Sequence, residues 1–271
     1  MAAVLPLDAA KAIVWFGRQC GIEIETCVAI PTTSGTGSEV TSACVISDPE
    51  KGIKYPLFDN ALYPDIAILD PSLVVSVPPA ITANTGMDVL THALEAYVSP
   101  RASDFTDALV EKSRANCFSI PAHCSEKKAL VLPPVAKCIM HRRLQEWPLA
   151  EAGLGLNHAI AHQLGGQFHL PHGLANALLL TAVIRFNAGD PRAAKRYARL
   201  AKTCHLCPDN ANDTASLNAL IQHIEQLKTT CKLPTLANAL KEKKSRMVNT
   251  HTRYGSGGTG GCNVAYQPAC G

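Results

Sequence analysis

Histidines are concentrated in one short part of this 271-residue chain, where four of its ten histidines lie between positions 158 and 172. His158 and His162 are four residues apart, a spacing that places both side chains on one face of a helix. Their neighbours are mostly Ala, Ile, Leu and Gly, so these imidazoles belong to a packed environment in which each polar nitrogen needs a partner. The segment therefore has to fold as a helix inside a protein interior that satisfies several imidazoles together.

A second pair of polar side chains has the same one-turn spacing. Asp88 and His92 lie within residues 86–97, whose apolar pattern predicts a helix. A carboxylate and an imidazole one turn apart can bind one metal ion together. Two alternatives need no metal: Asp88 could lie near the beginning of a helix and interact with its dipole, and the histidines could bond to backbone carbonyls in the core.

The side-chain types in these two segments restrict the choice of metal. One carboxylate and three neutral imidazoles suit Fe²⁺ or Zn²⁺, whereas Mg²⁺ and Ca²⁺ prefer shells made of oxygen. If such an ion binds an alcohol oxygen, it lowers the pKa of the hydroxyl and stabilises the alkoxide from which hydride can leave. A centre of this composition is therefore compatible with hydride transfer from an alcohol.

A turn rich in small hydroxyl residues follows a short apolar segment near residue 30. Residues 31–41 have the sequence PTTSGTGSEVT. Backbone N–H groups and hydroxyls in such a turn can bind a phosphate or a ribose. The spacing matches neither the GxGxxG of dinucleotide-binding folds nor a P-loop, so an ordinary turn is the alternative.

The chain divides into an α/β part and a helical part. Apolar residues repeat at helical spacing in residues 8–20, and residues 27–30 and 66–69 are typical of short buried strands. Residues 80–112 and 150–241 are rich in Ala and Leu at a helical period. The expected fold class is therefore α/β followed by all-α.

Two stretches depart from this organisation. Residues 113–149 contain three of the eleven cysteines and a Pro-Pro pair, without a sustained helical stripe. Residues 244–271 are rich in Gly and Thr. We expect the second stretch to be a disordered tail, because so much glycine is costly to order without apolar burial in return.

Charge and cysteine content exclude several classes of protein. The chain has 25 Lys and Arg against 22 Asp and Glu, a net charge of +3 that predicts no nucleic-acid partner. The longest apolar stretch, residues 175–184, is far shorter than the roughly 20 residues that cross a bilayer, so no membrane partner is expected. An odd number of cysteines and an N-terminus unlike a secretory signal predict reduced thiols and a cytoplasmic location.

Together, these motifs resemble the iron-containing (group III) alcohol dehydrogenases. The motifs that carry the resemblance are Pro31-Thr32-Thr33-Ser34-Gly35-Thr36-Gly37-Ser38-Glu39, Gly86-Met87-Asp88 with His92 and Glu95-Ala96-Tyr97, and His158 and His162 with Pro171-His172-Gly173. Within the family, the sequence is most similar to bacterial short-chain alcohol and propanol dehydrogenases. The resemblance implies a dehydroquinate synthase-like architecture, with an α/β nucleotide-binding domain, a helical metal-binding domain and the metal in the cleft between them.

The resemblance also implies an activity, cofactors and site residues. Members of the family interconvert a small primary alcohol and its aldehyde with NAD(H) or NADP(H), use Fe²⁺ or in some cases Zn²⁺, and usually form homodimers. His162 matches a histidine close to the metal that could relay a proton. The positions that match the four metal ligands are Asp88, His92, His158 and His172. Those that match cofactor-contacting positions are Asp8, Thr32, Thr33, Thr36, Thr41 and Lys54.

The same comparison of motifs predicts the domains. Residues 1–79 would form a partial nucleotide-binding domain, residues 80–243 the helical metal-binding domain, with 113–149 off the family pattern, and residues 244–271 the tail. Family members have further residues ahead of the position of Asp8, and glycines where this chain has Ala, Val and Leu at residues 2–5. We therefore expect an N-terminally truncated chain with weakened NAD binding, because side chains there obstruct close approach of the backbone to a pyrophosphate.

Two other interpretations follow from these departures. The first is a catalytically impaired fragment that still binds metal but does not turn over, because its nucleotide-binding half is incomplete. The second is a relative of zinc-dependent glycerol dehydrogenase or dehydroquinate synthase, which would share the architecture but use a different arrangement of ligands. The spacing of four and then ten residues between His158, His162 and His172 favours the iron-containing group over the second interpretation.

Overall fold

The computed structural model describes residues 6–33, 35, 37–48, 53–117 and 153–241. The predictions for residues 2–5, for Thr36, for most of residues 113–149 and for the tail at 244–271 lie outside the described residues. Among the helices that the structure does describe, none combines the length and the apolar character needed to cross a membrane.

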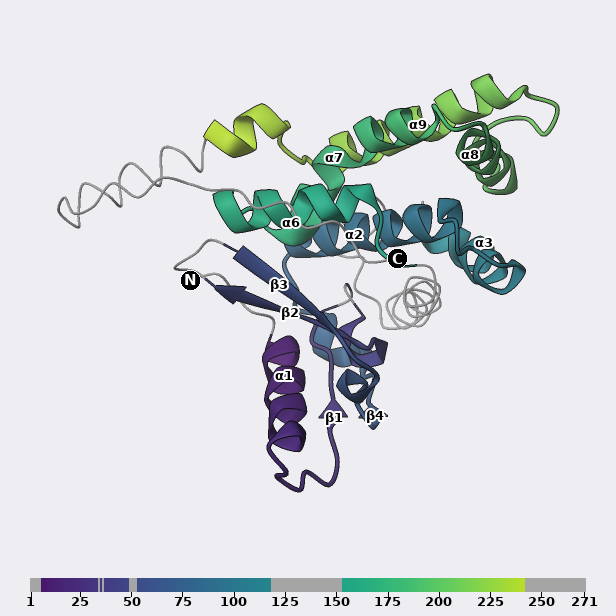
Figure 1. Cartoon of the computed structure of the whole chain (residues 1–271). Helices are drawn as coiled ribbons and strands as arrows, with labels where there is room; N and C mark the ends of the chain where they lie inside the picture. Colours follow the sequence, from purple (N-terminus) through teal and green to yellow (C-terminus); the bar gives the residue numbers. More distant parts are fainter. Residues whose placement is uncertain (1–5, 34, 36, 49–52, 118–152, 242–271) are drawn as a thin grey trace.

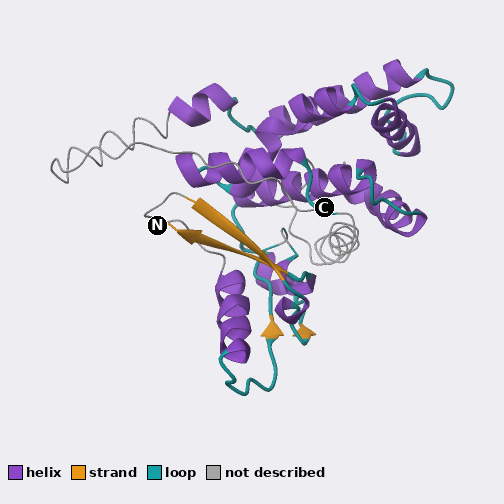
Figure 2. Cartoon of the chain, in the orientation of Figure 1, coloured by secondary structure: helices purple, strands orange, loops and turns teal. Residues whose placement is uncertain are grey.

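Two small sheets belong to the first part of the chain (Figure 2). β1 (Val28–Ala29) pairs in parallel with β4 (Ile66–Ala67), which confirms the two predicted strands in a shorter form. The prediction that they are buried is wrong except at Ala29, because the large side chains of Val28 and Ile66 are exposed. β2 (Ala43–Asp48) pairs with β3 (Ile53–Phe58) as an antiparallel hairpin that the sequence pattern did not predict. Pro56 lies within β3, and proline is tolerated there because both strands of a two-stranded sheet are edge strands.

A buried lysine attaches the first helix to the turn that precedes the hairpin. α1 (Pro6–Gln19) carries Lys11, whose Nζ donates to the backbone carbonyls of Ser38, Thr41 and Ala43 at 2.7, 2.7 and 2.6 Å. These three bonds match the three protons of an ammonium group. Lys11 thereby fixes the chain around residue 40 against α1. The 3₁₀ turns of this part are η1 (Ser38–Val40), η2 (Asn60–Leu62) and η3 (Pro71–Val74).

The remainder of the described chain is helical, which confirms the expected fold class (Figure 1). α2 and α6 each pack against α7, α8 packs against α9, and β3 of the hairpin contacts α6. The main core lies among α2, α7, α8 and α9 and contains Met87, Leu90, Leu94, Tyr97, Leu180, Ile184, Tyr197, Leu200, Leu220 and Ile224. The helices are α2 (Pro79–Val98), α3 (Asp104–Cys117), α6 (Leu156–Phe168), α7 (His172–Asn187), α8 (Pro191–Thr203) and α9 (Asp213–Thr230).

The backbone N–H groups at the beginnings of these helices find hydrogen-bond acceptors in different ways. Asp190 caps α8 by accepting from the Ala193 N–H at 2.9 Å, and Asn212 caps α9 in the same way. α6 begins after Gly155, which offers no side-chain cap. The N–H groups in the first turn of a helix have no partner within the helix, so those of α6 need a partner from elsewhere in the fold.

Candidate metal centre

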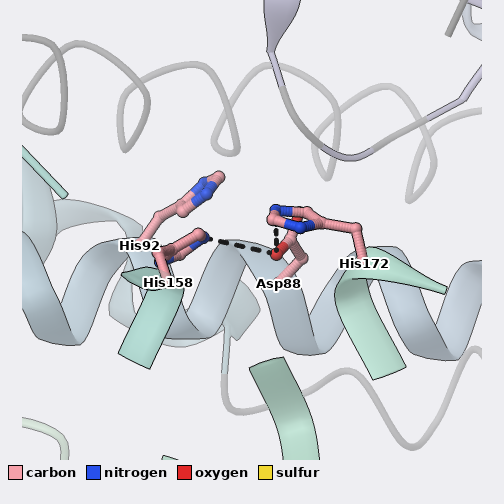
Figure 3. A group of neighbouring side chains, drawn as sticks. All are labelled: Asp88, His92, His158 and His172. Atoms are coloured by element: carbon pink, nitrogen blue, oxygen red, sulfur yellow. Dashed lines mark ion pairs between the residues drawn. The ribbon is translucent and has the colours of Figure 1, made fainter. Parts of the chain in front are cut away.

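Four side chains that can bind a metal come together on the helical part of the chain. Asp88, His92, His158 and His172 can each offer one ligand atom, and these atoms all lie within 4.8 Å of one another. Figure 3 shows the three imidazoles and the carboxylate turned toward a common space. The structure therefore places together the four residues for which a ligand role was predicted.

Three helices supply these four side chains. Asp88 and His92 lie one turn apart on α2, as their spacing predicts. His158 lies in the first turn of α6, and His172 is the first residue of α7. Residues that are far apart in the sequence thus meet because α6 and α2 both pack against α7.

A glycine lets α7 approach α2 closely enough to bring His172 to Asp88. A Cβ atom added at Gly173 would lie 2.2 Å from the backbone oxygen of Asn84 on α2 and 3.3 Å from the Cβ of Asp88. Any side chain at position 173 would therefore collide with the α2 backbone. Gly173 is part of the motif that carried the family resemblance, and this close approach is its structural reason.

The site is closed on most sides and open on one. Asp88 and His158 are each 1% exposed and His92 is also buried, whereas the side chain of His172 is 28% exposed. Burying a carboxylate and imidazoles is costly unless they have partners. Among the four side chains, that of His172 is therefore the one in contact with solvent.

The carboxyl group of Asp88 is ionised in this environment. Burial alone would raise the pKa of Asp88, but the neighbouring imidazoles of His172, His92 and His158 outweigh it and hold the pKa well below its usual range. Asp88 Oδ1 lies 3.4 Å from His172 Nε2 and 3.6 Å from His158 Nε2. The site therefore offers one negative oxygen beside imidazole nitrogens.

An unsatisfied nitrogen shows that these residues fit a metal ion. Nε2 of His158 is buried and has no hydrogen-bond partner in the part of the chain that the structure describes; the carboxylate oxygen Oδ1 of Asp88 lies 3.6 Å from it. Ligand atoms bound tetrahedrally at about 2.0–2.2 Å stand about 3.3–3.6 Å apart. Asp88 Oδ1 lies at this separation from the two nitrogens, and the four ligand atoms as a set lie within 4.8 Å of one another. One oxygen and three nitrogens are donors that Fe²⁺ and Zn²⁺ both accept.

A second carboxylate lies behind His158. Glu95 Oε2 is 2.6 Å from His158 Nδ1, and Glu95 also accepts the N–H groups of Gly155 and Asn157. Burial would raise the pKa of Glu95, but the hydrogen bonds from His158 and the backbone keep it below its usual range. Sequence reasoning quoted Glu95 within a motif but gave it no role. Its spacing of seven residues from Asp88, two helical turns, was the available signal.

Two buried asparagines hold the first carboxylate. Asn176 Nδ2 donates to Asp88 Oδ1 at 2.6 Å and lies 3.2 Å from His172 Nε2. Asn157 Nδ2 in turn donates to Asn176 Oδ1 at 2.9 Å. These two hydrogen bonds join α6, α7 and α2 behind the candidate ligands. The sequence analysis missed both asparagines, although Asn176 follows His172 by one helical turn.

The two other histidines of the array differ in position. The ring of His162, half-buried on α6, has its centroid 5.2 Å from that of His172 and 6.2 Å from that of His158. It therefore borders the centre without belonging to the group of four. His169 ends α6 in a left-handed conformation with φ of 51° and is exposed.

The candidate cofactor residues are only partly described. Thr32 is exposed, Thr33 is half-buried, and Thr41 is buried in contact with Lys11. Asp8 is also buried, and its carboxylate accepts from the Ser38 hydroxyl at 2.6 Å and the Val45 N–H at 3.1 Å. Thr36 and the side chain of Lys54 lie outside the described residues.

The hydroxyl-rich turn nevertheless lies against the helix that carries two candidate ligands. A Cβ added at Gly35 would lie 2.8 Å from the Cβ of Thr85 on α2, about one turn ahead of Asp88. The absence of a side chain at position 35 thus allows the turn to contact α2. A ligand bound by the turn would be near the metal centre.

Comparison with protein families gives two matches. The Fe-containing alcohol dehydrogenase family, C-terminal, matches residues 82–250, and iron-containing alcohol dehydrogenase matches residues 5–71. The chain is 75% identical over 241 residues to 1-propanol dehydrogenase PduQ of Citrobacter freundii. That alignment covers 88% of this chain and 64% of the relative, so the chain spans less than two thirds of the relative's length.

Two solved structures with the same fold are a 1,3-propanediol oxidoreductase and a sulfoacetaldehyde reductase. A 1,3-propanediol oxidoreductase superposes with a TM-score of 0.78 at 30% identity, over 87% of this chain and 64% of that one. A sulfoacetaldehyde reductase from Bifidobacterium kashiwanohense, solved in complex with NAD⁺, superposes with a TM-score of 0.68 at 27% identity, over 82% of this chain and 56% of that one.

Proposed function

This chain belongs to the iron-containing alcohol dehydrogenase family, and from that membership we propose that it serves the interconversion of a small primary alcohol and its aldehyde with a nicotinamide cofactor. The observation that carries the proposal is the convergence of Asp88, His92, His158 and His172, whose ligand atoms lie within 4.8 Å of one another. Similarity to a 1-propanol dehydrogenase and to a 1,3-propanediol oxidoreductase supports a short-chain alcohol as the substrate.

In this proposal, the four converging residues hold a single Fe²⁺, with Zn²⁺ as the other ion that the donor set accepts. A divalent ion held there supplies Lewis-acid chemistry, which lowers the pKa of an alcohol hydroxyl and favours loss of hydride from the adjacent carbon. Asp88 contributes a negative charge that partly neutralises the ion. The exposed side of His172 leaves room for the alcohol to enter.

His162 is proposed to carry the proton of the reaction. It borders the centre on the side of His172, whose ring centroid is 5.2 Å from its own. Its half-buried position joins the interior of the site to its surroundings. Imidazole is suited to this role because its unperturbed pKa lies near neutrality.

Nicotinamide binding is proposed for the α/β part of the chain. The support is the contact of Gly35 with Thr85, which brings the hydroxyl-rich turn close to the metal-bearing helix, and the NAD⁺ in the related sulfoacetaldehyde reductase. NAD(H) is the proposed cofactor and NADP(H) the alternative. The residues proposed to contact it are Asp8, Thr32, Thr33, Thr36, Thr41 and Lys54.

The buried carboxylate of Asp8 acts in this scheme by shaping the turn. Its bonds to Ser38 and Val45 hold the residues that follow the turn against α1. The proposed division places nucleotide binding in residues 1–79, metal binding in residues 80–243 and a tail in residues 244–271. The proposed working form is a cytoplasmic homodimer.

The test is a measurement of bound metal beside a titration with NADH, followed by oxidation of 1-propanol. The purified chain should retain about one Fe²⁺ or Zn²⁺ per molecule, because the site supplies one complete set of four ligands. NADH fluorescence should saturate, and NADH should form when alcohol and NAD⁺ are added. Metal without saturable NADH binding would instead indicate the metal-binding fragment.

Two single variants sharpen this test. His172→Ala should lower the metal content and abolish hydride transfer, because it removes one ligand of four. His169→Ala is the matched control, since this histidine lies three residues earlier but is exposed and outside the cluster. Loss of metal in the His169 variant, or full metal content in the His172 variant, would show that the wrong imidazole has been assigned.

A further inference from the structure

Glu95 occupies an unusual position between two helices. Its carboxylate belongs to α2, is buried, and accepts the backbone N–H groups of Gly155, Asn157 and His158 at 2.9, 2.7 and 3.3 Å. These N–H groups begin α6, and Gly155 has no side chain with which to cap them. A carboxylate from another helix therefore does the work of the missing cap.

The same carboxylate also determines what His158 can do. Oε2 of Glu95 lies 2.6 Å from Nδ1 of His158. Because an ionised carboxylate can only accept hydrogen bonds, Nδ1 has to be the nitrogen that carries the proton. In the neutral imidazole, Nε2 is then left with a free lone pair. This nitrogen is buried, has no hydrogen-bond partner among the described residues, and faces Asp88 Oδ1 at 3.6 Å.

The packing around Glu95 leaves it little freedom. A Cβ added at Gly155 would lie 2.8 Å from Oε1 and 2.9 Å from Cδ of Glu95. A glycine at position 155 thus both removes the ordinary cap and makes room for the carboxylate that replaces it. Four donors therefore fix the position and the orientation of the Glu95 carboxylate: the backbone N–H groups of Gly155, Asn157 and His158, and Nδ1 of His158.

We propose that Glu95 is a positioning residue of the metal centre, which holds His158 in the Nδ1–H tautomer and turns its Nε2 toward the cation. The proposal rests on the metal site of the proposed function and adds a role that concerns ligand orientation. A histidine ligand whose second nitrogen donates to a carboxylate is oriented and made more basic, and loss of such a partner weakens metal binding by about 10- to 100-fold.

The first experiment measures Zn²⁺ affinity of the full chain by competition with a chromophoric chelator. Glu95→Gln keeps the size of the side chain, yet its amide group has one acceptor oxygen where the carboxylate has two. We expect Zn²⁺ to bind about 10- to 100-fold more weakly to this variant. Affinity equal to that of the parent chain would overturn the proposal.

Asp190→Ala is the control for a merely structural role. It removes the side chain that caps α8 by accepting the Ala193 N–H at 2.9 Å, but α8 carries none of the four candidate ligands. Its Zn²⁺ affinity should equal that of the parent. An equal loss of affinity in both variants would show that Glu95 acts only through stability, and would overturn the proposal.

The second experiment needs no metal and separates this proposal from the proposed function. Histidine-selective ¹⁵N NMR of the metal-free parent chain reports which nitrogen of each imidazole is protonated, and the His158 signals are those lost in His158→Gln. We expect Nδ1–H in the parent and a shift toward Nε2–H in Glu95→Gln, whose amide can donate to Nδ1. Nε2–H in the parent would refute the role of Glu95. If the parent shows Nδ1–H but binds no Zn²⁺, the proposed function fails while the tautomer assignment stands.

Discussion

Replacement of Gly173 by alanine tests the claim that close helix packing builds the metal centre. The new Cβ would lie 2.2 Å from the Asn84 carbonyl oxygen, which is backbone and cannot rotate away. An ordinary contact between carbon and oxygen needs about 1 Å more. The start of α7 would therefore have to move away from α2 by about that amount, and His172 would move with it.

The expected magnitude follows from this displacement. Overpacking of a core costs about 1–3 kcal/mol, and the higher helix propensity of alanine returns up to about 1 kcal/mol. We therefore expect Gly173→Ala to lose up to about 3 kcal/mol of unfolding free energy. Metal bonds tolerate departures of only about 0.2 Å, so a shift of His172 by about 1 Å should abolish its bond to the ion.

The assay is urea unfolding of the metal-free chain together with Zn²⁺ titration by calorimetry. Gly189→Ala is the control, because it changes the same residue type beyond the other end of α7, where the nearest atom to the new Cβ is the Phe186 oxygen at 3.2 Å. A movement of a few tenths of an ångström relieves that contact, and the metal centre is at the opposite end of the helix. A Gly173 variant with the stability and Zn²⁺ affinity of the parent would refute the packing argument.

Two further predictions concern polar groups away from the metal. Lys11→Met should lower the unfolding free energy by at least about 3 kcal/mol, because three carbonyls in the interior lose their donor and each loss costs about 1–3 kcal/mol. Urea unfolding measures this loss. Lys195→Met is the control: Lys195 is exposed, so its replacement should cause no comparable loss. The pKa of Glu225 is lowered, because hydrogen bonds from Thr181 and Lys228 outweigh the opposing effect of burial. A carboxyl group whose pKa is lowered by folding stabilises the fold at pH values above its unfolded pKa, near 4.5, and this stabilisation is lost as the pH falls. Below pH 4.5, the stability of Glu225→Gln should therefore decline less steeply than that of the parent chain. An equally steep decline in both would contradict this account.

The sequence predicts those parts of the centre that depend on local geometry. The spacing of Asp88 and His92 places them on one face of α2 because a helix has a fixed period, and the structure shows both on that helix. Residues 27–30 and 66–69 were predicted as strands on another local signal, a short apolar run between turn residues, and two residues of each segment form a strand. The meeting of α2, α6 and α7 was not visible locally, and it entered through the family resemblance.

The parts that sequence reasoning missed are long-range partners. Glu95 and Gly155 are 60 residues apart, and no periodicity links a carboxylate on one helix to the uncapped beginning of another. The β2/β3 hairpin was missed because Pro56 interrupts β3 and because β2 begins with four consecutive apolar residues, which do not alternate with polar ones as in a half-buried strand. Asn157 and Asn176 were missed because a buried amide has no sequence signature until its partner is known.

The distribution of the candidate site over the fold predicts that the proposed metal site and the proposed nucleotide site are separable. All four candidate ligands, and the side chains of Glu95, Asn157 and Asn176 behind them, come from α2, α6 and α7. The α/β part reaches these helices through the contact of β3 with α6 and the approach of Gly35 to Thr85. Its own geometry depends on Lys11 and Asp8, which lie on α1. A change at Lys11 should therefore disturb the hydroxyl-rich turn, and with it any nucleotide site, while the helices that hold the metal keep their packing. If Lys11→Met loses NADH binding but keeps the Zn²⁺ affinity of the parent chain, the two parts have separate supports; equal loss of both would contradict this.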